Sequence, residues 1–117
     1  MAKIFKHSGL TIVEVDSEYD SLAVAQLEEL GVLLLEAARQ AEPPIMLLDL
    51  SETQYIGSSF LGVLMRVWKR LRDRHGRLAL CDANDVCGDV LRASKLDTIW
   101  DVFSDRATAV KELGVRS

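Results

Sequence analysis

Residues 47–73 read LLDLSETQYIGSSFLGVLMRVWKRLRD, and this stretch decides the fold. It starts within an apolar run, residues 45–50, whose only polar residue is Asp49. Such a run is typical of a strand buried on both faces of a parallel sheet. A helix is predicted over 58–75, because apolar residues recur there at a spacing of three and four. These residues are Leu61, Leu64, Met65, Trp68 and Leu71. The stretch therefore predicts a strand, a loop and an amphipathic helix in succession.

The sequence on both sides continues this alternation of strands and helices. Further strands are predicted at residues 3–6, 10–15, 77–83 and 98–104, and further helices at 22–41, 84–94 and 105–114. Strands that alternate with helices form a largely parallel sheet with crossover helices. A turn at residues 7–9 joins the first two strands as a hairpin, which makes the sheet mixed. We expect one domain over residues 1–117, and Gly76 as the residue that ends the helix at 58–75.

Composition excludes several classes of protein. The chain has 117 residues, 49% apolar and 27% charged, which is ordinary for one soluble domain. Its formal net charge of −4 lacks the electrostatic attraction that usually drives binding to nucleic acid. The N-terminus is too polar for a signal peptide, and no apolar run is long enough to span a membrane. Cys81 and Cys87 lack the spacing of a metal site. We expect a cytoplasmic domain without cofactor, metal or membrane partner.

Ser58 lies where the loop meets the helix, and its hydroxyl has two possible roles. A serine at this place can cap the helix, and loss of such a cap costs about 1 kcal/mol. A helix N-terminus also suits a phosphate, because its free N–H groups and its dipole favour negative charge. The two roles are compatible.

Catalysis finds little support in the sequence. Glu14, Asp16 and Asp49 end two predicted strands, which could suggest a magnesium-dependent phosphoaspartate site of the receiver kind. However, no well-placed lysine follows a later strand, and no nucleotide-binding or nucleophile motif is present. We interpret Asp49 as a hydrogen-bond acceptor for the loop backbone, and a small enzyme of the receiver or phosphatase kind is disfavoured.

Residues 45–103 resemble the STAS domain of bacterial anti-sigma factor antagonists. The family pattern is a strand ending in Asp-Leu, then Asp-Ser-Ser-Gly-Leu-Gly at the start of an amphipathic helix, and Ser-Gly-Leu before the last strand. The matching residues are Asp49, Leu50, Ser58, Ser59, Leu61, Gly62, Gly76, Ser94 and Leu96. The resemblance implies an α/β STAS fold, with a mixed sheet of four to five strands and helices packed mainly on one face.

The resemblance also implies a function. An antagonist of this family binds an anti-sigma factor with a histidine-kinase-like ATPase fold and releases the sigma factor. The kinase then phosphorylates the first serine of the pair, which ends binding, and a serine phosphatase resets the switch. Here that serine is Ser58, with Ser59 as the alternative, so the chain would be a kinase substrate and not an enzyme. The partner-binding residues implied are Glu18, Asp20, Gly57, Ser58, Ser59, Phe60 and Gly62.

Four positions depart from the family pattern: Gly57 replaces Asp, Phe60 replaces Gly, Lys95 replaces Gly, and the loop before the first helix has Ser17 in place of Gly. Without the carboxylate at 57, kinase recognition or loop geometry could differ. Phe60 could pack in the core or anchor a partner. A STAS-like scaffold that binds its partner without being phosphorylated, in a stress-signalling or lipid-transport complex, is therefore the alternative. The basic residues of 66–77 are interpreted as a solvated helix face.

Overall fold

The computed structural model describes residues 3–15, 24–53 and 55–114. These residues form a five-stranded sheet in the order β1-β2-β3-β4-β5. The strands are β1 (Lys3–His7), β2 (Leu10–Glu14), β3 (Ile45–Asp49), β4 (Arg77–Cys81) and β5 (Asp101–Phe103). The pairing of β1 with β2 is antiparallel, and the other three pairings are parallel. The predicted mixed sheet and its initial hairpin are confirmed.

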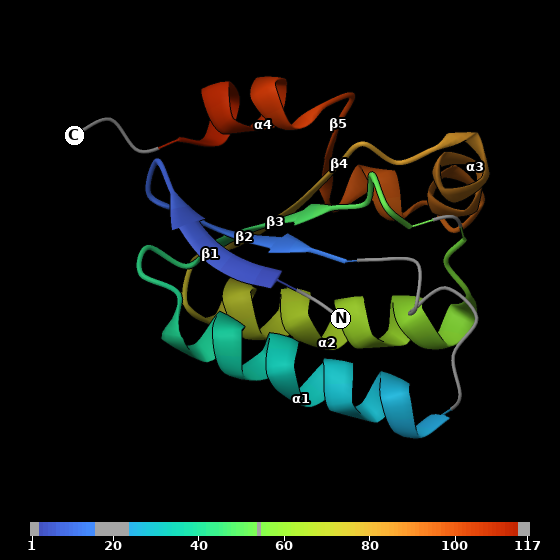
Figure 1. Ribbon diagram of the computed structural model, residues 1–117, viewed down its shortest axis with the longest axis horizontal. Helices are drawn as coiled ribbons and strands as arrows, with labels where there is room; N and C mark the ends of the chain where they lie inside the picture. The colour runs from blue at the N-terminus through green and yellow to red at the C-terminus, as the bar shows by residue number, and fades with distance from the viewer. Residues whose placement is uncertain (1–2, 16–23, 54, 115–117) are drawn as a thin grey trace.

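The helices cover the two faces of the sheet unequally (Figure 1). The helices are α1 (Val24–Gln40), α2 (Ser58–Asp73), α3 (Asp85–Ala93) and α4 (Arg106–Leu113). In Figure 1, α1 and α2 lie side by side beneath the sheet, while α4 covers the opposite face alone. Alternate strand residues point to opposite faces. Thus Leu48 belongs to the large core cluster beneath the sheet, and Leu47 to the small cluster under α4. The prediction that the helices pack mainly on one face is confirmed.

The last strand is shorter than the sequence predicts. The expected strand at 98–104 reduces to Asp101–Phe103, because residues 96–98 form a 3₁₀ turn first. Trp100 stays in that turn, with its N–H donating to the carbonyl of Leu96 at 2.9 Å, and its side chain is buried in the core. Lys95 begins the turn with φ 59°, so a lysine adopts the left-handed conformation where the family has glycine.

The end of α2 also differs from the prediction. His75, and not Gly76, is the left-handed residue, with φ 60°. Gly76 is required for a different reason, since a Cβ there would lie 2.0 Å from the carbonyl oxygen of Pro44. That carbonyl accepts a hydrogen bond from the N–H of Arg77 at 3.0 Å. Gly76 thus lets the chain that enters β4 approach the chain that enters β3.

Candidate functional site

The serine pair opens α2 at the surface. The N-cap is Gly57, with extended dihedrals (φ −99°, ψ 176°) and no side-chain hydrogen bond. Ser58 is therefore the first helical residue, and the prediction that its hydroxyl caps the helix is wrong. Ser58 and Ser59 are both exposed, and neither hydroxyl bonds to another described residue. The first N–H groups of a helix have no partner within the helix, so this end retains its positive character.

Two buried side chains fix the serine pair in place. Ile56 is fully buried before the pair, and Phe60 is 2% exposed directly after it. Both belong to the core cluster between the sheet and α1 with α2. Phe60 is therefore a core residue, and its ring offers almost no surface to a partner. Of the two roles left open for Phe60, packing in the core and contact with a partner, its burial supports the first, in which the ring anchors the first turn of α2.

Small residues line the exposed side of this helix end. Gly62 lies one turn after Ser58, and a Cβ built there would meet no atom of the described residues within 4 Å. At Gly57 a Cβ would only touch the ring of Tyr55, at 3.5 Å. Tyr55 is itself half exposed. Packing within the chain therefore demands neither glycine, and the backbone of this helix end is open to close approach.

The loop that leads to the serine pair is tied to the end of β2. Thr53 is 2% exposed, and its hydroxyl donates to the carbonyl of Val15 at 2.8 Å. The N–H of Val15 in turn donates to the carbonyl of Asp49, at 3.3 Å. The thiol of Cys87, on α3, lies 3.8 Å from the carbonyl oxygen of Thr53. Thr53 thereby connects the loop after β3 to the chain that leaves β2.

A charged cluster holds the same strand ends together. Arg106, the first residue of α4, donates from Nε to Oδ2 of Asp49 at 2.8 Å and also pairs with Glu14. Oδ1 of Asp49 accepts the N–H of Ser51 at 2.8 Å, which confirms that Asp49 bonds to the loop backbone. Burial raises the pKa of Asp49, but the hydrogen bonds from Ser51 and Arg106 outweigh it and leave the pKa below its usual value.

Asp49, Cys81 and Asp82 lie close enough to share a metal ion, with their ligand atoms within 4.8 Å of one another. The chemistry of these three side chains does not suit a metal ion. Burial and the charge of Asp49 raise the pKa of the Cys81 thiol, which disfavours the thiolate form that a metal ligand requires. Oδ2 of Asp49 already accepts a hydrogen bond from the guanidinium of Arg106. Asp49 therefore belongs to an ion-pair network with Arg106 and Glu14 that joins the ends of β2 and β3.

The other predicted site residues fall into two groups. Gly57, Ser58, Ser59 and Gly62 come together at the start of α2. Glu18 and Asp20 lie outside the described residues. Thr53 and Arg106 were not anticipated, although the position of Glu14 and Asp49 at neighbouring strand ends is a signal that a cation should lie between them.

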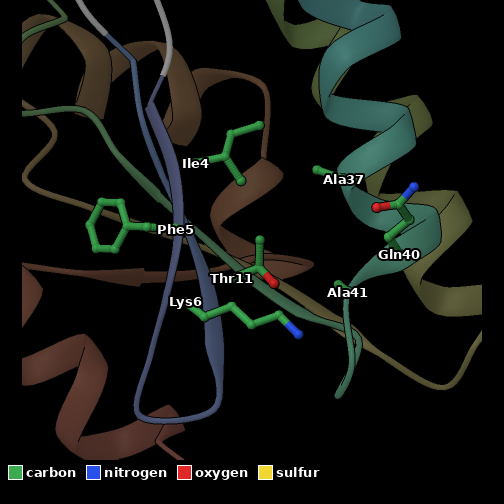
Figure 2. A pocket seen from close by; sticks show the side chains of 7 residues that line it. All are labelled: Ile4, Phe5, Lys6, Thr11, Ala37, Gln40 and Ala41. Atoms are coloured by element: carbon green, nitrogen blue, oxygen red, sulfur yellow. The ribbon is translucent and has the colours of Figure 1, made fainter.

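A separate hollow of about 240 Å³ lies between β1 and the end of α1. Figure 2 shows Ile4 and Ala37 facing one another across it, with Thr11 and Lys6 beside them. The ammonium of Lys6 lies 3.5 Å from the carbonyl oxygen of Glu42. This hollow is near the start of β2, whereas the serine pair follows the other end of the parallel strands. It is therefore not part of the candidate site.

Three comparisons place the chain among known proteins. The family model for the STAS domain matches residues 2–109. The anti-sigma F factor antagonist of Paenibacillus polymyxa is 28% identical over 111 residues, which are 95% of this chain and 92% of that protein. BtrV of Bordetella bronchiseptica is 30% identical over 105 residues, 89% of this chain and 86% of that protein.

The fold has a similar counterpart among solved structures. The structure of an anti-sigma-factor antagonist (STAS) domain protein from Planctomyces limnophilus aligns with a TM-score of 0.86 and 27% identity. The alignment covers 95% of this chain and 96% of that one. Among the described helices, none has the length and apolar character needed to cross a membrane.

Proposed function

The chain belongs to the STAS domain family, and on that premise we propose that it is an anti-sigma factor antagonist switched off by phosphorylation of Ser58. It would bind an anti-sigma factor of the histidine-kinase-like ATPase type and so release a sigma factor. The relative from Paenibacillus polymyxa carries the name of such an antagonist, which supports the proposal. The protein would act in the cytoplasm as a regulator and a kinase substrate, with a serine phosphatase to reset it.

The observation that carries the proposal is the position of Ser58. Its hydroxyl is exposed at the first turn of α2 and forms no bond with another described residue, so a kinase can reach it. A phosphate adds about 1.5 to 2 negative charges, which a helix N-terminus tolerates. Because Ile56 and Phe60 hold the chain from the core on either side, the phosphate would change the surface and leave the fold intact.

The partner surface we propose centres on Gly57, Ser58, Ser59 and Gly62. A glycine inside a helix costs about 0.5–1 kcal/mol relative to alanine. Gly62 has no neighbour within the chain that would exclude a Cβ. A partner that packs against this backbone would account for the glycine. Glu18 and Asp20 join the surface on the strength of the family resemblance.

The experiment uses the Ser58→Ala protein as bait in extracts of its own cells. We expect it to retain an anti-sigma factor, which is then produced in pure form. Ser58→Asp should bind this anti-sigma factor at least about tenfold more weakly than the parent. Ser104→Asp is the control, since Ser104 is also an exposed serine near a helix start and lies two residues before α4. Equal affinity of Ser58→Asp and the parent would refute the switch.

A second function is favoured by one observation, the missing carboxylate at Gly57. Without it, the chain could bind its partner constitutively, as a scaffold in a stress-signalling or lipid-transport complex. The two functions differ in one measurable property: the scaffold carries no phosphate on Ser58 under any growth condition.

A further inference from the structure

Positive charge is concentrated on one segment of this acidic protein. Residues 66–77 hold six of the 14 basic residues and one of the 18 acidic residues. Their net charge is therefore +5, and that of the remaining chain is −9. The segment comprises the second half of α2 and the turn that follows it.

Three of these cations form neither an ion pair nor a ring contact with a described residue. Arg74 pairs with Glu42, Arg77 pairs with Asp101, and the guanidinium of Arg72 stacks over Trp68 at 4.7 Å from the ring centre. The other three are Arg66, Lys69 and Arg70, which we call the basic stripe. All three are exposed, and none forms an ion pair with a described residue.

The basic stripe continues the surface that begins at the serine pair. Ser59, Gly62, Arg66 and Arg70 follow one another at a spacing of three and four, so they share one side of α2. Ser58 and Arg66 are separated by eight residues, or about 12 Å along the helix axis. At physiological salt the Debye length is about 8 Å. A phosphate on Ser58 would therefore act on the partner locally and change the electrostatic potential at the basic stripe only slightly.

We propose that the partner surface extends from the serine pair onto the basic stripe, and that the anti-sigma factor presents an acidic surface to it. This inference rests on the proposed function. The two parts then have different tasks. The basic stripe steers the partner and raises the association rate, while contacts at Ser58 hold the complex and are broken by the phosphate.

A protein partner fits the charges better than nucleic acid does. The three cations of the basic stripe would neutralise only about three phosphates, fewer than the six to ten of a typical DNA-binding surface. An extended polyanion would also be repelled by the remaining chain, whose net charge is −9. A folded partner with a confined acidic patch meets the basic stripe alone.

The test measures association with the purified anti-sigma factor by stopped flow, at about 50 mM and about 300 mM salt. The variant is Arg66→Gln with Lys69→Gln and Arg70→Gln. The matched control is Lys3→Gln with Lys95→Gln and Lys111→Gln, three exposed cations on separate segments. Both triple variants change the net charge by the same amount. Melting curves establish that both remain folded.

We expect the stripe variant to associate about tenfold more slowly at low salt, with a dissociation rate within about twofold of the parent. Its association rate should also lose most of its dependence on salt, while the control follows the parent. Equal association rates for the two triple variants would overturn the inference and leave the proposed function standing. Random-sequence duplex DNA that displaces the anti-sigma factor from the parent would also overturn it. A parent that binds no anti-sigma factor would refute the proposed function itself.

Discussion

Nε of Arg106 donates to Oδ2 of Asp49 at 2.8 Å, across 57 residues of sequence. The bond joins the first residue of α4, on one face of the sheet, to the end of β3, which leads to the loop of the serine pair. The same guanidinium pairs with Glu14 at the end of β2. One side chain therefore bridges two carboxylates where two parallel strands end.

Arg106→Gln should lower the free energy of unfolding by about 2 kcal/mol at pH 7, because it leaves the buried carboxylate of Asp49 without its cation. Urea unfolding measures the loss. The matched variant is Arg77→Gln, which removes an exposed ion pair with Asp101 and should cost less than about 1 kcal/mol. Equal losses in the two variants would show that Arg106 has no special role.

Asp49 should make stability depend on pH. Its pKa is lower in the folded than in the unfolded protein, so its contribution is complete above the unfolded pKa of about 3.9 and is lost as the pH falls through the folded value. Asp49→Asn should therefore be less stable than the parent at pH 7, and the difference should shrink below about pH 4. A difference that stays constant down to pH 2.5 would contradict the pKa assigned to Asp49.

Ser58→Ala should change the free energy of unfolding by less than about 0.5 kcal/mol, because the N-cap is Gly57 and the Ser58 hydroxyl bonds to no described residue. Asn84→Ala provides the comparison. The side chain of Asn84 accepts the N–H of Cys87 at 2.8 Å, so its loss should cost about 1 kcal/mol. Thermal melting of both variants compares the two losses of stability.

Gly57→Asp should raise the free energy of unfolding by about 0.5 kcal/mol, because an N-cap carboxylate can accept a first-turn N–H and favours the helix dipole. The extended dihedrals of Gly57 suit any residue, and the nearest atom to a Cβ is 3.5 Å away. Gly57→Ala separates the effect of the carboxylate from that of a less flexible chain. A variant with Asp less stable than the one with Ala would refute the capping argument.

Gly62→Ala should stabilise the protein by about 0.5–1 kcal/mol, because it removes the helix cost of glycine where a Cβ meets no atom. The same change should weaken binding of the anti-sigma factor, since the methyl group lies on the proposed partner surface. A stabilised variant with unchanged affinity would place Gly62 outside that surface.

Regular patterns allowed most of the fold to be predicted. The apolar run at 45–50 predicts β3 because this strand is buried on both faces of the sheet. The apolar spacing after Ser58 predicts α2 because this helix buries one consistent side. The shorter β5 was predicted too long, since burial of Trp100 in a turn leaves no trace in a run of alternating residues.

The site was less predictable than the fold. A shift of one residue at the start of α2 moves the cap from Ser58 to Gly57, and boundaries of this kind are poorly fixed by sequence. Arg106 is far from Glu14 and Asp49 in sequence, so only the folded sheet shows that it serves both. Phe60 belongs to the core because the helix turns it inward.

Phosphate on Ser58 should end binding to the anti-sigma factor, and the phosphate content of bound and free protein reports this directly. The native protein is isolated from its own cells in two pools, one bound to the anti-sigma factor and one free, and the phosphate on Ser58 is quantified in each by mass spectrometry. The account predicts an unphosphorylated bound pool and a free pool that carries phosphate on Ser58. Equal phosphorylation of the two pools, or a fully covered peptide without phosphate in every growth condition, would contradict it.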